Sequence, residues 1–158
     1  MGIVSEIPDF IKPEEDVREQ LARIYLTPND MDILICTHFD YDHAGANHLF
    51  ASAELIVQRE HYACARSSTL DRFKAIRASW DHPDLRYRLV EGDTIIVPGV
   101  EVIETSGHAP GHQSVLVRLP ETGPVLLCGD ALHHDPEIPT SRAQWIWIQR
   151  KRPLALKR

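Results

Sequence analysis

The spacing of apolar positions predicts a helix near the start of the chain. Val17, Leu21 and Ile24 recur at positions i, i+4 and i+7, which places them on one face of a helix. Pro13 suits the first turn of a helix, and the acidic residues that follow it suit the positive end of the helix dipole. The sequence therefore predicts an amphipathic helix within residues 12–28.

Short apolar runs, bounded by polar or turn-forming residues, predict strands along the rest of the chain. The predicted strands cover residues 31–38 and 53–58, three runs within 86–105, and two runs within 112–130. Two helices are expected between the second and third strands, over residues 59–66 and 70–79. Helices between the early strands and tight turns between the late ones indicate an α/β or α+β domain, with a mixed sheet and flanking helices.

Length and composition narrow the class of protein. The 158 residues, 43% of them hydrophobic, are enough for one domain with a core. A net charge of -6 argues against nucleic acid or an anionic membrane as the main partner, and no apolar run is long enough to cross a bilayer. The start of the chain lacks the pattern of a secretory signal. Three cysteines without a C-x-x-C spacing favour reduced thiols in the cytoplasm.

Charge divides the chain into two parts. Residues 141–158 contain six basic residues and no acidic ones, whereas residues 1–140 contain 11 basic and 23 acidic residues. We interpret 1–140 as the folded domain and 141–158 as a divergent basic tail. A solvated tail and a shifted reading frame both account for such an end.

A dense group of histidines and aspartates follows the first predicted strand. In "THFDYDHAGANH", residues 37–48, the side chains of His38, Asp40, Asp42 and His43 come directly after an apolar run. Imidazole nitrogens and carboxylate oxygens are the usual ligands of zinc and similar divalent ions. Carboxylates crowded together without a cation would repel one another. We therefore predict that a loop directs these side chains into one cleft, where they form a metal site.

Two further groups follow later predicted strands. "TSGHAPGH" contains His108 and His112, and "CGDALHHD" contains Asp130, His133, His134 and Asp135. Each group alone is compatible with an ordinary turn, but the strand ends of one sheet would bring all three groups to the same edge. Isolated histidines are more often surface or core residues than ligands, and we assign His61 and His82 to that class.

These linked motifs resemble those of the metallo-β-lactamase-fold hydrolases, and most closely the N-acyl-homoserine-lactone lactonase branch. The resemblance rests on "THFDYDH", "TSGHAPGHQS" and "LLCGDA", and extends from about Glu14 to about Asp135. It implies an αββα sandwich and a small lactone or ester substrate. It also implies two divalent ions, zinc above all, that hold the attacking hydroxide. It assigns the first ion to His38 and His108, the second to Asp42 and His43, the bridge to Asp130, and a loop-shaping role to His112.

Two positions depart from the family pattern within these motifs. Asp40 stands where the family usually has histidine; aspartate is a competent ligand, and it shifts the expected preference toward iron or manganese. His133 stands where lactonases of this kind often have a tyrosine. Its imidazole either donates a proton to the leaving alkoxide or faces solvent. Asp42, besides binding metal, is a candidate for orienting the hydroxide.

A third departure concerns the extent of the family fold. The resemblance begins at the first helix and ends before the late metal-binding histidine of the family, so we interpret the chain as truncated at both ends. Uncovered sheet edges would favour a homo-oligomer. Two other functions stay open: an impaired fragment that binds at most one metal ion, and a thioester hydrolase of the same fold.

Overall fold

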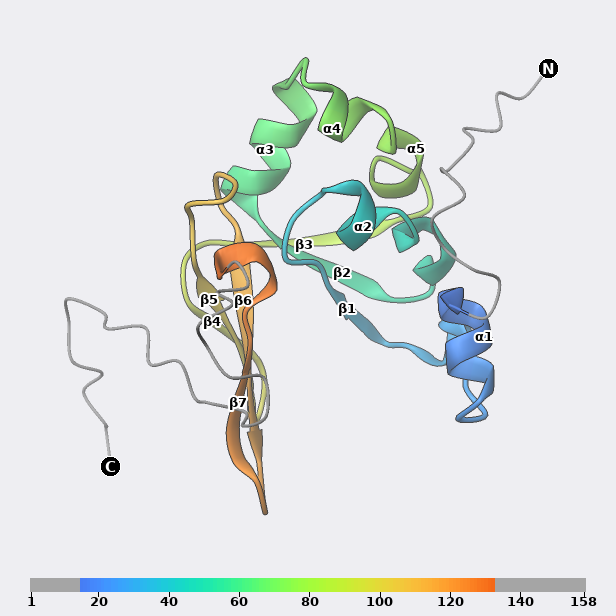
Figure 1. The fold of residues 1–158 in the computed structure, drawn as a ribbon, viewed down its shortest axis with the longest axis vertical. Helices are drawn as coiled ribbons and strands as arrows, with labels where there is room; N and C mark the ends of the chain where they lie inside the picture. Colours follow the sequence, from blue (N-terminus) through green and yellow to red (C-terminus); the bar gives the residue numbers. More distant parts are fainter. Residues whose placement is uncertain (1–14, 133–158) are drawn as a thin grey trace.

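The computed structural model of the protein describes residues 15–132, which form two β-sheets with helices packed against one of them (Figure 1). The first sheet has the order β1-β2-β3, and its strands are parallel: β1 (Ile33–Ile35), β2 (Glu54–Gln58) and β3 (Arg86–Val90). Parallel neighbours require crossover connections, and helices provide them after β1 and β2.

The second sheet is an antiparallel meander in the order β4-β5-β6-β7, with β4 (Thr94–Val97), β5 (Val100–Glu104), β6 (Gln113–Leu119) and β7 (Gly123–Leu127). The predicted turn at Pro98-Gly99 joins β4 to β5, and Gly99 has a positive φ of 86° there. The predicted α/β architecture with parallel and antiparallel strands is confirmed. The two kinds of strand, however, are separated into two sheets instead of being mixed in one.

Helices cover the outer face of the parallel sheet, above it in Figure 1. They are α2 (Tyr41–Ala44), α3 (Arg59–Ser67), α4 (Asp71–Lys74) and α5 (Arg77–Trp80). Helix α1 (Val17–Ala22) lies to one side of this layer, at the lower right of the figure. There are also 3-10 turns at Pro28–Asp30, Asn47–Phe50 and Gly129–Ala131, and the last of these contacts β6 of the antiparallel sheet. Among residues 15–132, no helix has the length and apolar character needed to cross a membrane.

Two predicted helices differ from their observed extents. The helix predicted over residues 12–28 spans only Val17–Ala22, because the side chain of Asp16 accepts a hydrogen bond from the backbone N–H of Arg18 and caps it there. No residue of α1 is buried, and the expected apolar face ends at Ile24, whose exposed fraction is 62%. The helix predicted over 70–79 is divided into α4 and α5, since the backbone of Ile76 leaves the helical region.

The main core lies between the parallel sheet and α3, α4 and α5. Phe39 stacks on Trp80 with ring centroids 4.8 Å apart and planes inclined by 10°. The indole nitrogen of Trp80 donates to the backbone oxygen of Phe73 over 3.1 Å. Because Phe39 lies between His38 and Asp40 in the sequence, this packing anchors the backbone of the first motif.

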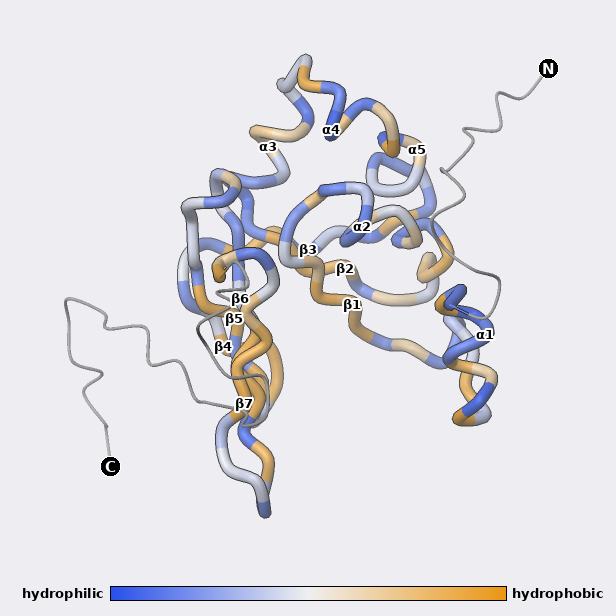
Figure 2. The backbone as a smooth tube through the Cα atoms, in the orientation of Figure 1, coloured by the Kyte–Doolittle hydropathy of each residue, from blue (hydrophilic) through white to orange (hydrophobic). Residues whose placement is uncertain are grey.

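A second core joins the two sheets through Ile56, Val90, Ile96 and Val102. Figure 2 shows that the strands of both sheets are hydrophobic over most of their length. An open apolar groove lies between the two sheets. The groove is lined by residues of β1 and of all four antiparallel strands: Ile33, Ile35, Ile96, Val97, Val100, Val115, Val117 and Leu127.

A pair of buried glutamines ties the sheets together at the end where the motifs lie. Gln58 ends β2 and Gln113 begins β6, and the amide nitrogen of Gln58 donates to the amide oxygen of Gln113 over 3.1 Å. Gln113 donates in turn to the backbone oxygens of Cys36 and Ile56, at 2.8 and 3.2 Å. A fully satisfied buried network of this kind fixes the relative position of the two sheets.

Candidate metal centre

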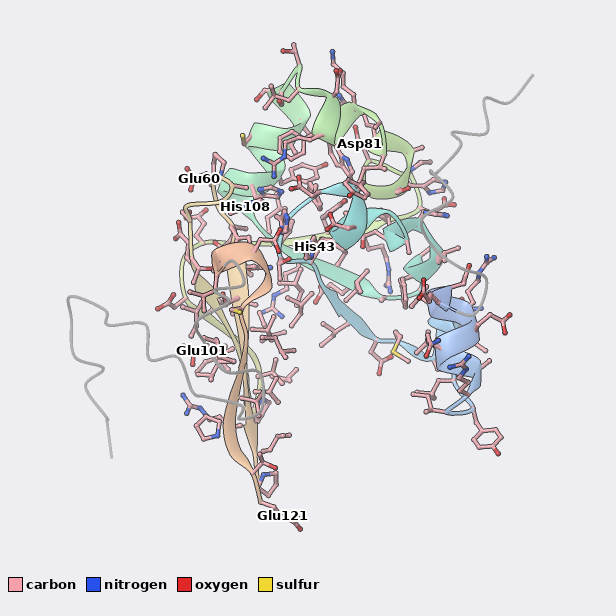
Figure 3. The ribbon with its side chains drawn as sticks, in the orientation of Figure 1. His43, Glu60, Asp81, Glu101, His108 and Glu121 are labelled. Atoms are coloured by element: carbon pink, nitrogen blue, oxygen red, sulfur yellow. The ribbon has the colours of Figure 1, made fainter. Side chains whose placement is uncertain are left out.

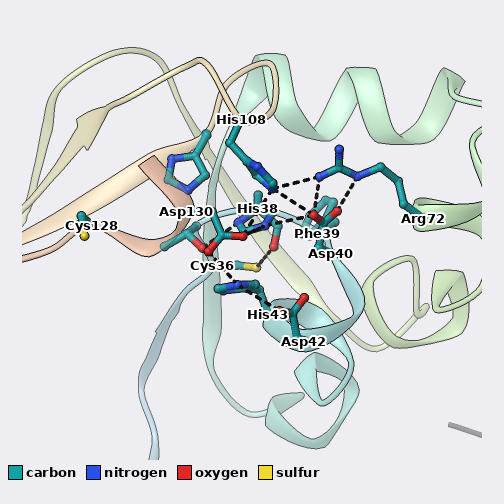
Figure 4. A network of polar contacts seen from close by, with 12 residues as sticks. Cys36, His38, Phe39, Asp40, Asp42, His43, Arg72, His108, Cys128 and Asp130 are labelled. Atoms are coloured by element: carbon teal, nitrogen blue, oxygen red, sulfur yellow. Dashed lines mark hydrogen bonds and ion pairs between the residues drawn. The ribbon is translucent and has the colours of Figure 1, made fainter. Parts of the chain in front are cut away.

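Three loops bring histidine and aspartate side chains together where the two sheets meet. His38 follows β1, His108 lies between β5 and β6, and Asp130 lies in the 3-10 turn Gly129–Ala131 after β7. Figure 3 shows His43 and His108 at this junction, and Figure 4 shows the contacts among the clustered residues. The strand ends therefore converge, although they belong to two sheets.

Four of these residues form a compact group of potential ligands: His38, Asp40, His108 and Asp130. One ligand atom from each lies within 4.8 Å of all the others. The Nε2 atoms of His38 and His108 are 3.3 and 3.1 Å from Oδ2 of Asp40. Such a set of two imidazoles and two carboxylates matches the chemistry of sites for zinc, iron or manganese.

Asp130 faces two groups of ligands with its two carboxylate oxygens. Its Oδ2 atom lies 3.5 Å from Nε2 of His38 and 3.4 Å from Nε2 of His108. Its Oδ1 atom lies 3.4 Å from Nε2 of His43, which is itself 3.6 Å from Oδ2 of Asp42. A carboxylate in this position can contact two cations at once, one with each oxygen.

Burial keeps the imidazole of His38 neutral. Its side chain is fully buried, and desolvation, followed by the neighbouring His43, lowers its pKa to about 4. Thr37 Oγ1 contacts Nδ1 of this ring over 3.0 Å, whereas Nε2 is buried without a hydrogen-bond partner. A neutral ring with a buried, unpartnered nitrogen is a costly arrangement by itself, and it fits a divalent cation bound at that atom.

The carboxylate of Asp40 is paired with an arginine from α4. Arg72 donates from Nε to Oδ1 over 2.6 Å and from Nη2 to Oδ2, and Nη2 lies 3.1 Å from Nε2 of His108. Burial acts to raise the pKa of Asp40, but the hydrogen bonds and the positive charge of Arg72 outweigh it and hold the pKa below its ordinary value. Asp40 is therefore charged at neutral pH.

His61 holds two of the loops in register. It is fully buried, its Nε2 atom accepts from the backbone N–H of Phe39 over 2.8 Å, and its Nδ1 atom contacts the oxygen of Pro110 over 2.8 Å. Because Nε2 accepts, the proton of the neutral ring is on Nδ1, which donates to Pro110. Gly111 has a φ of 63°, and a Cβ atom there would lie 2.5 Å from the backbone nitrogen of His61.

His112 makes hydrogen bonds inside the loop between β5 and β6, which also contains His108. Its ring is fully buried, with Nδ1 at 2.8 Å from Oγ1 of Thr105. Its backbone N–H donates to the oxygen of Ala109, and its backbone oxygen accepts from the N–H of Thr105. These contacts connect the two ends of the loop between β5 and β6.

The structure brings together all six residues that the sequence singles out as metal ligands: His38, Asp40, Asp42, His43, His108 and Asp130. The other candidate catalytic residue, His133, lies outside the described residues. His61 is a satisfied core residue, as expected, whereas Arg72 was missed. No local signal in the "LDRFKAIRAS" segment distinguishes Arg72 from a surface arginine, because its partner is 32 residues away.

Comparison with known proteins identifies the family. A sequence model of the metallo-β-lactamase superfamily matches residues 6–155. An N-acyl homoserine lactonase from a Bacillus species is 40% identical over 118 residues, covering 75% of this chain and 45% of the relative. A lactonase from Rhizobium radiobacter is 39% identical over 141 residues, covering 84% of this chain and 53% of the relative. The chain thus spans about half the length of the curated relatives it matches.

A solved structure of an N-acyl homoserine lactone hydrolase has the same fold. It superposes with a TM-score of 0.67 at 35% identity, covering 75% of this chain and 46% of that chain. That hydrolase was solved with the product N-hexanoyl-L-homoserine bound at its catalytic metal centre. The family match over nearly the whole chain shows that this protein belongs to the metallo-β-lactamase superfamily.

Proposed function

We propose that the chain holds two divalent ions, zinc being the first choice, and serves in the hydrolysis of a lactone such as an N-acyl homoserine lactone. The observation that carries this proposal is the position of Asp130, whose two oxygens face two separate histidine groups. The similarity to lactonases supports the substrate class.

The proposed ligands divide into two sets that share Asp130. His38, Asp40 and His108 complete the first set, and Asp42 and His43 complete the second. Bound ions would lower the pKa of a water molecule at the centre and polarise the carbonyl of the substrate.

Residues of the chain itself would orient the reactants. Asp42 is the most exposed member of the cluster, with 55% of its side chain accessible, and it is suited to accept a hydrogen bond from a water molecule there. We further propose that His133 gives a proton to the leaving alkoxide. Residues 1–140 form the partial hydrolase domain in this proposal, and residues 141–158 a basic tail outside it.

The cysteines, the net charge and the apolar groove support proposals for the cellular compartment, the partners and the oligomeric state of the protein. Cys36, Cys64 and Cys128 are free thiols, which suits the reducing cytoplasm. The acidic domain disfavours nucleic acid and anionic membranes as partners. The open apolar groove favours self-association into a homo-oligomer, and light scattering during size-exclusion chromatography measures this directly.

Hydrolysis by zinc-loaded protein tests the proposed function. We expect N-hexanoyl homoserine lactone to be opened, as followed by mass spectrometry, and an acyl thioester to be hydrolysed more slowly. Asp130→Asn should reduce lactone hydrolysis by about 100-fold, because the bridging charge is lost. Asp84→Asn, a matched change at an exposed aspartate, should leave it unchanged. Faster thioester hydrolysis would assign the other substrate class.

A single-metal protein without hydrolase activity is the second candidate. The observation that favours it is the second ligand set, which contains one imidazole, that of His43, among residues 15–132. Elemental analysis of the zinc-loaded protein separates the two candidates. Nearly two zinc ions per chain support the hydrolase, and one or fewer supports the single-metal protein.

A further inference from the structure

Arg72 reaches into the candidate metal centre from outside the sequence motifs. Figure 4 shows its guanidinium beside Asp40 and His108. Its Nε atom donates to Oδ1 of Asp40 over 2.6 Å, and its Nη2 atom both bonds Oδ2 of Asp40 and lies 3.1 Å from Nε2 of His108. Nη2 therefore contacts ligand atoms of two residues, Asp40 and His108, that belong to the first proposed set of metal ligands.

A metal ion and this guanidinium require the same electron pairs. In the tautomer with its proton on Nδ1, His108 has one lone pair on Nε2, which either accepts a hydrogen bond from Arg72 or binds a cation. Oδ2 of Asp40 lies at the centre of the ligand set, 3.3 Å from Nε2 of His38. A divalent ion held by these atoms would also be close to a fixed positive charge, and that repulsion is strong in a partly buried site.

Arg72 is placed where it can both enter and leave the centre. Its side chain is 35% exposed, in contrast to 14% for Asp40, so solvent can receive the guanidinium. The guanidinium carbon lies 5.2 Å from the centre of the Phe73 ring, and Phe73 itself is buried. Helix α4 is therefore anchored by its own buried residue Phe73, while the side chain of Arg72 is held mainly by the carboxylate of Asp40.

We propose that Arg72 is an internal cation that competes with the first metal ion for Asp40 and His108. In the metal-free protein, Arg72 neutralises Asp40 and keeps the ligand set together. Metal binding at this set requires Nη2 to withdraw from both atoms, so Arg72 weakens the affinity of the site for the ion. The inference rests on the metal centre of the proposed function and adds to it a residue that controls occupancy.

Zinc titration in competition with a chromophoric chelator tests this proposal without using enzyme activity. Arg72→Gln removes the charge and should increase the zinc affinity of the first site by about tenfold or more. Arg72→Lys keeps a charge but loses the two-pronged contact with Asp40, and should give a smaller increase. The gain should disappear when His108→Ala is added to Arg72→Gln.

Arg77→Gln is the matched control. Arg77 also pairs with a carboxylate, that of Asp81 at 3.0 Å, and lies 5.5 Å from the centre of the Trp80 ring, but it does not contact the cluster. The zinc affinity of the Arg77→Gln variant should equal that of the unaltered protein.

Unchanged or weaker zinc binding by Arg72→Gln would overturn the proposal, because an arginine that merely supports Asp40 as a ligand would produce that result. If circular dichroism shows that Arg72→Gln does not fold, Arg72→Lys decides: tighter binding supports competition, and equal or weaker binding overturns it. Absence of zinc binding in every variant overturns both this proposal and the proposed function. Tighter binding without lactone hydrolysis supports the role of Arg72 and refutes the proposed function alone.

Discussion

Replacing His61 by leucine tests how the scaffold positions the ligand loops. The side chain is fully buried and connects the backbone N–H of Phe39, next to His38, with the backbone oxygen of Pro110, close to His108. Leucine has a similar volume but neither accepts nor donates a hydrogen bond. His61→Leu therefore removes both contacts without opening a large cavity.

The magnitude follows from the groups that lose their partners. The N–H of Phe39 is buried, and leaving such a donor unsatisfied costs about 1–3 kcal/mol. The carbonyl of Pro110 belongs to an exposed residue and can bind water, so its loss costs about 0.5–1.5 kcal/mol. Together these give a loss of about 1.5–4.5 kcal/mol in the free energy of unfolding. For a chain of this size, that corresponds to roughly 3–18 °C in Tm.

Urea unfolding of the metal-free protein, followed by circular dichroism, measures this loss. His61→Gln should lose less than His61→Leu, since an amide offers both an acceptor and a donor. His82→Leu makes the same change at a histidine whose side chain is 37% exposed and, among residues 15–132, accepts only from the backbone N–H of Asp84, an exposed residue, and it should alter the free energy of unfolding by less than about 1 kcal/mol. If His61→Leu were as stable as His82→Leu, the linking role of His61 would be refuted.

Three further results are expected. Burial lowers the pKa values of His38 and His112 from 6.5 to about 4, so between these pH values the unfolded chain binds more protons than the folded one. The free energy of unfolding of the metal-free protein should therefore fall as pH is lowered from about 6.5 toward about 4, and urea titrations that give the same free energy across this window would contradict the prediction. Gly111→Ala should destabilise more than Gly123→Ala by over about 1 kcal/mol in thermal unfolding, because both glycines have positive φ but only Gly111 has backbone within 3 Å of the added Cβ atom. Gln113→Leu should lower the free energy of unfolding by about 1–3 kcal/mol in the same urea assay, since it leaves the buried backbone oxygen of Cys36 without its side-chain donor, while the oxygen of Ile56 keeps the backbone N–H of Cys36; a loss below about 0.5 kcal/mol would argue against the glutamine link.

The sequence was sufficient to predict the strands and the residues of the cluster, because both leave local signals. Apolar runs ending in polar residues predicted the strands, and the density of histidine and aspartate after them predicted where side chains converge. Asp40, Asp42 and His43 are close in sequence, so their proximity follows from one tight turn and helix α2. Asp130 was found through its family motif more than through the pattern of its own loop.

Long-range pairing was not predictable in the same way. Which strands become neighbours depends on contacts between distant residues, and the packing of one sheet against the other depends on buried pairs such as Gln58 with Gln113, 55 residues apart. Arg72 and His61 have no local feature that distinguishes them from surface or core residues. Their roles arise only when the fold brings them to Asp40 and to Phe39.

The proposed function requires cations bound where these loops meet, and anomalous X-ray diffraction at the zinc absorption edge from crystals of zinc-loaded protein tests this most directly. We predict one peak within about 2.0–2.2 Å of ligand atoms of His38, Asp40, His108 and Asp130, and a second at about the same distance from Asp42, His43 and Asp130. A map with no peak beside Asp130, or with zinc only at sites remote from the cluster, would contradict the metal centre.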